Sequence, residues 1–580
     1  MGILLVVVAV GADRSFDFTD EGVYYLSAIN PSDVPDRQTT YFYIGRALFA
    51  ATGHSLLLTR VVIASLLLGS TLLFNRGATA FLTAFAPALK LGPWLGVATV
   101  AGTALAFSIS PVAPSYNLFN AIFLLAATGL VLRASALPRS ADRTDSLTLL
   151  GLLLAAALLV GLDFFVKFST CAVLVGGLTL FFLLTSRASW LRKTLILLAA
   201  PAVGLIVGAG YFIFVERFAV WRAGIGGTLS GLSNGTYLRD ELLRYVREIQ
   251  THVLETFWAY ADVLTAVLVV GAILLCCRSR PRIQRGLAAA GFAIILGLFA
   301  ISPLPAGSIH LNGVLGLRLH LGALVVLGVA VAATLLVRKS PSDRSFLAGA
   351  WRLLPLVPLF AVLPYAGAFG TTNNINTNTI YQFGPWLALI ALATGILAHA
   401  WQAAWLMPLC LLPLIAITLF QSFTGYWLHP YRIPGGRPAQ TEPTLIGAPA
   451  YASTLRLDPA SHDFIAATRA QLTAHGFKPG DDIFAFYNLP GLVFALGGVS
   501  PGHPWYFSGD QRSLDLDAMR VSMVASARRT RAFVITNGDV TSFLPRLHAA
   551  GLDFPAAYHR CGESLKNPLT QETVEVWRPR

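Results

Sequence analysis

The stretch Asp17-Phe-Thr-Asp20-Glu21-Gly-Val-Tyr24-Tyr25 holds three carboxylates in five residues, in a chain that is only 12% charged. It follows an apolar run from Ile3 to Val10, so it lies where a chain would leave a membrane. The simplest interpretation is that these acids are solvated loop residues. Folding at a bilayer surface does not require them, however, so the alternative is that they form the centre of a functional site.

The composition around this stretch is that of a membrane protein. Of the 580 residues, 55% are hydrophobic, and the mean hydropathy is +0.64, which is too apolar for a soluble globular protein. The net charge of +13 does not require nucleic acid as a partner, because basic residues of membrane proteins gather in cytoplasmic loops and at anionic headgroups. The five cysteines show no metal-ligand spacing and predict no disulfide framework.

Long apolar runs alternate with short polar loops until about residue 425. We expect a polytopic α-helical membrane domain over residues 1–425 and a small α/β domain over residues 426–580, an ordinary domain size. The first run is shorter than the roughly 20 residues that span a bilayer, so its helix is either short or begins upstream of Met1. About 13 transmembrane helices are predicted: 2–12, 56–74, 94–112, 117–133, 147–162, 169–185, 194–215, 258–277, 286–302, 319–337, 351–367, 380–399 and 404–423.

Basic residues set the expected orientation of these spans. Loops after the second, fourth, sixth, eighth and tenth spans are rich in Lys and Arg, and alternate loops share one side, which the loop-charge rule makes cytoplasmic. The acidic stretch and the C-terminal domain then lie together on the other side of a bacterial inner membrane, in the periplasm or outside. The basic residues are Arg76, Lys90, Arg133, Arg139, Arg143, Arg187, Arg192, Lys193, Arg278, Arg280, Arg282, Arg285, Arg338, Lys339, Arg344 and Arg352.

Two polar segments have predictable local structure. Between 238 and 257, apolar residues recur every three or four positions, which predicts an amphipathic helix on the membrane surface, preceded by a flexible glycine-rich segment from Gly224. In the C-terminal part, a helix from Asp458 to about Ala474 and strands near 482–487, 531–536 and 573–577 predict an α/β domain. No nucleotide-binding glycine fingerprint follows these strands, so we expect this domain to recruit substrate or cover the membrane site.

The acidic stretch has two chemical uses. A carboxylate beside an apolar wall has a raised pKa and can act as a general base. A pair of carboxylates can instead hold a divalent cation that neutralises a phosphate.

An Asp-Glu pair in the first extracytoplasmic loop, followed by glycine and aromatic residues, resembles the C-type integral-membrane glycosyltransferases. The resemblance is nearest to the protein O-mannosyltransferase and lipid A aminoarabinose transferase branches. The phrase Gly53-His-Ser-Leu-Leu-Leu-Thr-Arg60-Val, which opens the next span, is also similar, as is the layout of roughly residues 15–400. Thr19 precedes the pair where the aminoarabinose branch commonly has Arg, so the subfamily stays open.

This resemblance implies an enzyme that takes a sugar from a polyprenyl-phosphate carrier. The acceptor outside the cytoplasm would be a cell-envelope glycan, a lipid or a protein. One acid of the first loop would deprotonate the acceptor, with Asp20 expected first, Glu21 second and Asp17 third. Alternatively, Asp20 and Glu21 would bind a divalent metal ion, Mg²⁺ or Mn²⁺.

A leaving phosphate needs cations on the same side of the membrane. Lys167 is a candidate and lies four residues after Asp163, although a lone lysine there can also snorkel to the interface. Arg217 and Arg222 are further candidates, with binding to anionic lipid as the alternative. Arg60 near a helix end either has a partner or snorkels. Residues that would contact the substrate are Tyr24, Tyr116, Asn117, Asn373 and Asn374, whose asparagines also suit ordinary turns.

A transporter or flippase for a lipid-linked glycan is the alternative function. Such proteins show internal repeats and ionisable residues deep in their helices. The chain has no evident repeat, and its predicted spans carry few charges near their centres. Because its charges gather toward one side, the sequence favours the transferase.

Overall fold

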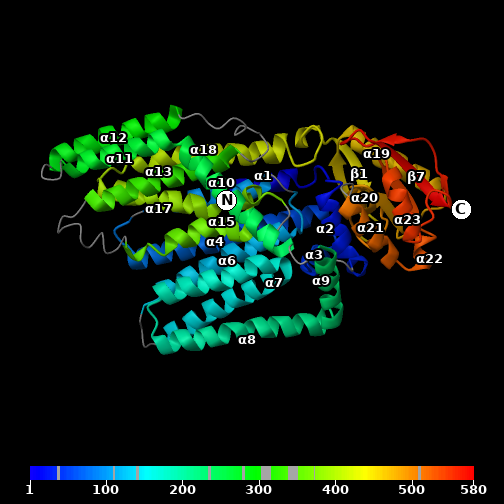
Figure 1. Cartoon of the computed structure of the whole chain (residues 1–580), viewed down its shortest axis with the longest axis horizontal. Helices are drawn as coiled ribbons and strands as arrows, with labels where there is room; N and C mark the ends of the chain where they lie inside the picture. The colour runs from blue at the N-terminus through cyan, green and yellow to red at the C-terminus, as the bar shows by residue number, and fades with distance from the viewer. Residues whose placement is uncertain are drawn as a thin grey trace.

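The computed structural model describes residues 1–34, 39–89, 91–108, 111–138, 143–232, 237–276, 281–301, 315–337, 351–370, 373–506 and 511–580. Helices fill the chain up to residue 428, and the strands all follow residue 441. Figure 1 shows the helices as a bundle with the strand-containing part at one end. Of the predicted basic positions, Lys90, Arg139, Arg278, Arg280, Arg338, Lys339 and Arg344 lie outside the described residues.

The helices of the bundle are α1 (Gly2–Gly11), α2 (Asp20–Ile29), α3 (Tyr41–Ala51), α4 (Leu56–Phe85), α5 (Pro93–Ala104), α6 (Tyr116–Ala136), α7 (Arg143–Thr185), α8 (Trp190–Phe214), α9 (Phe218–Leu232), α10 (Tyr237–Ala259), α11 (Ala261–Cys276), α12 (Pro281–Ile301), α13 (Leu315–Val337), α15 (Leu356–Ala368), α16 (Ile375–Asn378), α17 (Gly384–Ala400) and α18 (Leu406–Phe423). Serine hydroxyls cap the N-termini of α4 and α6. Ser55 accepts from the Leu58 N–H and Ser115 accepts from the Leu118 N–H, both at 3.2 Å.

Within the described residues, five helices are long and apolar enough to cross a membrane: α4, α6, α7, α13 and α18. Two bent pairs raise the number to seven if each pair is one span. Several predicted spans are shorter apolar helices, among them α15 and α17. The interior of α17 is largely buried by its neighbours, and a helix buried in protein can be apolar without crossing the membrane. The number of thirteen spans therefore stays a prediction.

Helix α7 breaks at Lys167, whose backbone is non-helical (φ −154°, ψ 83°). Its 42-residue candidate span Thr144–Thr185 would extend about 63 Å as one straight helix, roughly twice the hydrocarbon core. The break falls inside the turn that the sequence predicts between the spans 147–162 and 169–185. It leaves the Phe165 carbonyl free to accept from the Thr40 N–H at 2.9 Å, which ties the break to the residues before α3.

Two further helix pairs bend sharply. The Leu198–Phe214 part of α8 meets the Phe218–Ile225 part of α9 at 99°, and Arg239–Ala259 meets Ala261–Leu274 at 64°. Figure 1 shows α9 turning across the end of the bundle. The glycine-rich segment from Gly224 is helical, as part of α9, and its expected flexibility stays a prediction.

The expected amphipathic helix is present as α10, but it is covered on one side. Tyr245 packs against Phe369 with ring centroids 4.9 Å apart, and Glu248 accepts from the Ile375 N–H at 2.9 Å. Leu242, Val246 and Phe257 stay exposed. One side of α10 therefore packs against the protein, and a second apolar side is exposed.

The C-terminal part contains a hairpin and a mixed sheet. Strands β1 (Glu442–Ile446) and β2 (Ser453–Leu457) pair antiparallel. In the sheet, β3 (Ile483–Phe486) runs parallel to β4 (Phe533–Asn537), and β7 (Thr573–Pro579) joins β4, β5 (Tyr558–Arg560) and β6 (Leu565–Lys566) antiparallel. The helices are α19 (Pro459–Ala474), α20 (Pro490–Leu496), α21 (Gln511–Met523), α22 (Ser526–Arg529) and α23 (Leu544–Ala549). Asp458 caps α19 through the Ser461 N–H at 3.0 Å, as its sequence predicts.

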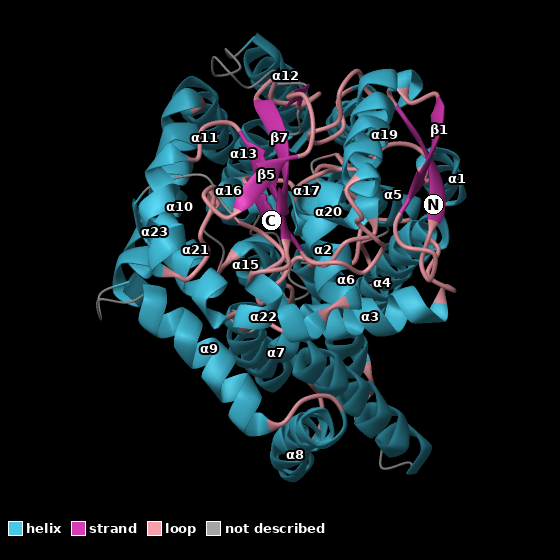
Figure 2. Ribbon diagram, turned by 90° about the vertical axis from the view of Figure 1, so that its right-hand side faces the viewer, coloured by secondary structure: helices cyan, strands magenta, loops and turns pink. Residues whose placement is uncertain are grey.

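The segment between α1 and α2 binds this C-terminal part directly. Arg14 forms a parallel β-bridge with Arg456 of β2, and the Ser15 N–H donates to the Arg456 carbonyl at 2.8 Å. Phe16 stacks on Phe494 of α20 at 5.6 Å. Figure 2 views the molecule from this end, with α19 and α20 in front of α2. The acidic stretch therefore lies at the junction of the helical bundle and the strand-containing part.

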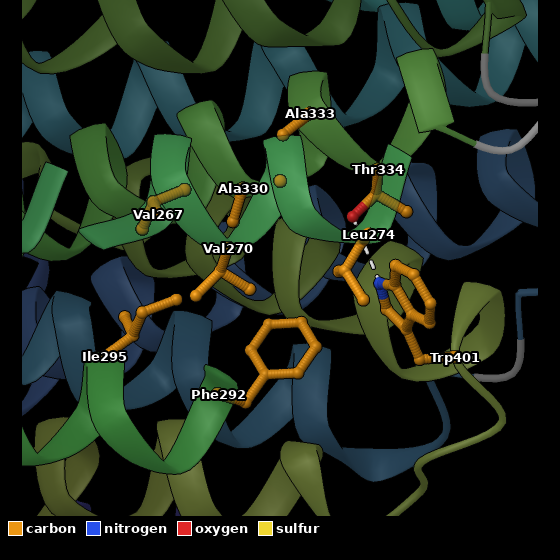
Figure 3. Close-up of a pocket in the computed structure, with 10 residues that line it drawn as sticks. Val267, Val270, Leu274, Phe292, Ile295, Ala330, Ala333, Thr334 and Trp401 are labelled. Atoms are coloured by element: carbon orange, nitrogen blue, oxygen red, sulfur yellow. Dashed lines mark hydrogen bonds between the residues drawn. The ribbon is translucent and has the colours of Figure 1, made fainter. Parts of the chain in front are cut away.

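A cavity of about 20 Å³ lies among α11, α12, α13 and Trp401. Figure 3 shows its apolar lining, with the Trp401 indole donating to the Thr334 hydroxyl at 3.1 Å. This volume holds about one water molecule. We regard it as a packing void, since none of the predicted site residues lines it.

Candidate functional site at the bundle junction

Asp17 is fully buried and organises the turn that leads into α2. Its carboxylate accepts from the Thr19 N–H at 3.0 Å, the Thr19 hydroxyl at 2.7 Å and the Glu21 N–H at 3.2 Å. These donors include backbone N–H groups at the start of α2 that no helical carbonyl can satisfy. Burial, and next the charge of Asp20, raise the pKa of Asp17 to about 7 despite these hydrogen bonds.

Glu21 is paired with Arg60 inside the protein. The distance from Arg60 Nη2 to Glu21 Oε1 is 2.7 Å, with 4% and 2% of the two side chains exposed. Arg60 also donates to the carbonyls of Ala12 at 2.6 Å and Ser15 at 2.9 Å. Arg60 therefore has a partner and does not snorkel. Its bonds to the Ala12 and Ser15 carbonyls hold the segment between α1 and α2 against α4, and its pair with Glu21 holds α2 there.

Asp20 is the acid of the predicted stretch that stays partly open, with 24% of its side chain exposed. Arg432, from the connection between α18 and β1, places Nη1 3.9 Å from Asp20 Oδ2 and donates to the Thr19 hydroxyl at 2.7 Å. Burial raises the pKa of Asp20, while Arg432 and a side-chain hydrogen bond with Tyr431 oppose the rise. Asp20 is thus a carboxylate that can reach solvent beside a cation.

Tyrosines line the bundle next to Asp20. The ring centroids of Tyr24, Tyr41 and Tyr116 are 5.7 to 6.4 Å apart. Burial raises the pKa of Tyr24 and of Tyr41, and the Asp20 charge adds to both rises. These phenols are neutral hydrogen-bonding groups near neutral pH.

Lys167 reaches the same tyrosines from the break in α7. Its Nζ lies 5.9 Å from the centre of the Tyr116 ring and donates to the Gly367 carbonyl at 2.6 Å. Since only 3% of Lys167 is exposed, snorkelling is excluded. Asp163 is completely buried, and within the described residues neither of its carboxylate oxygens has a hydrogen-bond partner. Lys167, four positions later at the break in α7, is the cation whose charge acts on Asp163.

The C-terminal end of α15 is held by side chains of α7. Besides Lys167, Thr170 donates to the Ala366 carbonyl and Ser169 to the Phe369 carbonyl, both at 2.9 Å. Helix ends leave such carbonyls without helical partners. The break in α7 therefore fixes the end of α15 beside the tyrosines.

The other predicted residues are distributed around this junction. Asn117 is buried, and its Oδ1 has no hydrogen-bond partner among the residues that the structure describes. Asn373 and Asn374 are exposed before α16, and Arg217 and Arg222 are exposed at the bend between α8 and α9. The structure thus brings Asp17, Asp20, Tyr24, Tyr116 and Lys167 into one connected group, and it leaves both arginines outside the contacts of that group.

The described residues do not fit the expected metal pair. They contain no group of three or more His, Cys, Asp or Glu side chains that would hold a metal ion. The Glu21 carboxylate is bound by Arg60, and a cation at Asp20 would compete with Arg432. Mg²⁺ or Mn²⁺ would therefore be coordinated by the Asp20 carboxylate and not by the Glu21 carboxylate.

Arg432 and Tyr431 are the residues that sequence reasoning missed. They are more than 400 positions from Asp20 and carry no motif. The available signal was their place in the short connection that joins the last apolar run to the C-terminal part.

An apolar groove of about 190 Å³ lies between the second half of α7 and α15. It extends from Leu184 and Pro355 to Val173 and Ala366. Ala366 is the residue whose carbonyl accepts from Thr170, so the groove ends next to the Lys167 contact.

No protein-family model matches the sequence, and a search of curated proteins gives no match. Crystal structures of the oligosaccharyltransferase of Archaeoglobus fulgidus are similar in structure. The one tethered by a disulfide bond to an acceptor peptide containing the NVT sequon is 13% identical, with a TM-score of 0.44, and the match covers 98% of this chain and 73% of that chain.

Two further structures of this archaeal enzyme match over a similar range. The complex with an inhibitory peptide and a dolichol-phosphate is 12% identical, with a TM-score of 0.43 and coverages of 99% and 74%. The complex with zinc and sulfate is 13% identical, with a TM-score of 0.42 and coverages of 98% and 72%. By their names, these structure neighbours are oligosaccharyltransferases of Archaeoglobus fulgidus.

Proposed function

We propose that this chain is a glycosyltransferase that moves a sugar from a polyprenyl-phosphate carrier to an acceptor outside the cytoplasm, with Asp20 as the general base. The observation that carries the proposal is the state of the three acids. Glu21 is neutralised by Arg60, and Asp17 is buried beneath the turn. Asp20 alone among them combines a raised pKa with an exposed fraction that a substrate can reach.

The reaction requires two events at the anomeric carbon. The acceptor hydroxyl gives its proton to the Asp20 carboxylate while its oxygen bonds to that carbon. The bond between the carbon and the phosphate oxygen breaks, and the carrier leaves as polyprenyl phosphate.

The donor lipid has a suitable place beside this site. The groove between α7 and α15 is lined by apolar side chains, and its α7 face from Val173 to Leu184 is about 16 Å long at 1.5 Å per residue. We assign it to part of the polyprenyl chain. Lys167 at its end retains ammonium donors besides the one that Gly367 accepts. The tyrosines and Asn117 are our candidates for contacts with the sugar.

The test is a transfer assay with the purified full chain in lipid vesicles. Radiolabelled polyprenyl-phosphate hexoses serve as donors, and an envelope fraction from the source cells serves as acceptor. We expect Asp20→Asn and Asp20→Ala to lower the rate about 10²- to 10⁴-fold. Asp13→Asn is the matched control, because Asp13 lies in the same segment and pairs with Arg456 at 3.4 Å near the surface; it should keep nearly full activity.

Two outcomes would change the assignment. Unchanged transfer by a folded Asp20→Asn variant would remove Asp20 as the base. Movement of the labelled carrier between the two leaflets, with no transfer of its sugar by the wild type, would favour the flippase instead.

A further inference from the structure

Arg432 differs from the other arginines at the bundle junction in how its guanidinium is used. Arg60 is bound by Glu21 and by backbone carbonyls. Arg437 donates to the carbonyls of Gly11, Arg14 and Tyr426. Both are buried, with 3% and 6% exposed. They act as structural ties between the first segment and its surroundings.

Arg432 keeps much of its binding capacity. Its side chain is 39% exposed, and within the described part of the chain its hydrogen bond and its ion pair both use Nη1. A guanidinium has five N–H donors. The 3.9 Å separation from Asp20 is at the outer limit of an ion pair, and exposed pairs of this kind hold each other weakly.

The backbone keeps this arginine in place. Arg432 has a φ of +52°, a conformation that residues other than glycine rarely adopt and that clusters at functional sites. The Ile433 N–H donates to the Pro430 carbonyl at 3.2 Å, which closes the turn around it. Its guanidinium carbon lies 4.8 Å from the Tyr431 ring centre. The cation is therefore presented to the Asp20 side of the junction by a defined turn.

We propose that Arg432 binds the phosphate of the polyprenyl carrier, both in the donor and in the departing polyprenyl phosphate; this rests on the function proposed above. A planar guanidinium binds two phosphate oxygens at once. Its position beside the base suits a reaction in which the attacked carbon lies between the acceptor oxygen and the leaving phosphate. Among the described residues, Arg217 and Arg222 lie outside the contacts of this group.

The experiment measures binding by the purified full chain, separately from transfer. The probes are a polyprenyl phosphate, inorganic phosphate and the uncharged polyprenol, each titrated in nanodiscs. We expect Arg432→Ala to weaken binding of polyprenyl phosphate at least tenfold and to leave polyprenol binding unchanged. Arg432→Lys should recover part of the loss, and Arg217→Ala and Arg222→Ala should bind like the wild type. Wild-type binding by Arg432→Ala would overturn the proposal.

A second variant separates phosphate binding from support of the turn. Thr19→Val removes the hydroxyl that Arg432 and Asp17 contact. The variant still contains the Arg432 guanidinium. An equal loss of affinity in Thr19→Val and Arg432→Ala, both with unchanged melting temperatures, would make Arg432 a support of the turn and overturn its role in phosphate binding. A loss confined to Arg432→Ala supports that role. Inorganic phosphate binding that Arg432→Ala abolishes, without any effect on the polyprenyl phosphate, would reassign the site to free phosphate.

The two proposals fail in different ways. If the wild type binds no polyprenyl phosphate, the proposed transferase function fails. If it binds the carrier and transfers sugar while Arg432→Ala binds equally well, only the assignment of Arg432 fails.

Discussion

Gly22 of α2 and Gly491 of α20 meet backbone to backbone. A Cβ on Gly22 would lie 2.2 Å from the Gly491 nitrogen, and that N–H donates to the Phe18 carbonyl at 2.7 Å. Only glycine permits this approach of the bundle to the C-terminal part. The contact fixes the turn that carries Asp20.

Gly22→Ala should therefore separate the two parts. Overpacking at a tight contact costs about 1–3 kcal/mol and sometimes more, so we expect a lower melting temperature and a large loss of transfer. Intrinsic fluorescence during heating measures the first effect. Gly69→Ala is the control, because a Cβ there meets nothing within 4 Å; a melting temperature for Gly22→Ala equal to that of Gly69→Ala would contradict the contact.

Arg60→Met should destabilise the fold by about 3–5 kcal/mol, because it leaves the Glu21 carboxylate buried without a partner. Thermal unfolding in detergent measures the loss. The double variant Glu21→Gln/Arg60→Met removes the uncompensated charge and should recover part of the stability. If the single and double variants have the same melting temperature, the Arg60–Glu21 pair does not contribute the stability that we assign to it.

Asp17→Asn should change how stability depends on pH. The pKa of Asp17 is about 7 in the folded protein and 3.8 in its ordinary state. Between these values the folded state holds a proton that the unfolded state has lost, so the contribution of Asp17 to stability falls as pH rises through this window and is flat above it. Relative to the wild type, Asp17→Asn should therefore melt at a comparatively higher temperature at pH 8 than at pH 5.

The variant also loses hydrogen bonds of Asp17, but that loss lowers stability at both pH values. The change in melting-temperature difference between pH 5 and pH 8 therefore reports proton uptake by Asp17 alone. Asp13→Asn controls for the removal of one negative charge from the same segment. A wild-type-minus-variant difference that is the same at pH 5 and pH 8 would show that Asp17 does not take up the proton.

Lys167→Met should lower stability by about 1–3 kcal/mol, because the Gly367 carbonyl loses its buried donor and the buried Asp163 loses the nearby cation. Asp163→Asn/Lys167→Met should recover stability, as judged by thermal unfolding. The donor titration supplies the second measurement. If Lys167 also contacts the phosphate, the double variant regains stability but not affinity for polyprenyl phosphate; recovery of both would limit Lys167 to holding α7 and α15.

Local signals in the sequence predicted much of the architecture. The change in hydropathy near residue 425 precedes every strand, and Asp458 with Pro459 begins α19 where capping rules place it. The polar residues between two apolar runs located the break at Lys167. The number of spans was harder to predict, because hydropathy cannot distinguish a short helix buried among other helices, such as α17, from one that crosses the bilayer.

The candidate site shows a different limit. The sequence placed three acids side by side and had no means of separating them. The pairing of Glu21 depends on Arg60, which is 39 positions away. The surroundings of Asp20 depend on Arg432, which contacts the neighbouring Thr19 across 413 positions. Partners that are distant in sequence decide whether a carboxylate forms a buried ion pair or stays accessible as a base. No local sequence pattern identifies these partners.

The bonds between the first segment and the C-terminal part also impose an order on biosynthesis. Arg528 binds Asp33 at 2.7 Å across 495 positions of the chain, which a ribosome takes roughly 25 to 100 s to add. During that time the acids and Arg60 have already been made, but Asp33 does not yet have Arg528 as its partner. A nascent chain that stops before Arg528 would carry every carboxylate of the site, but its first segment would lack this tie to the C-terminal part.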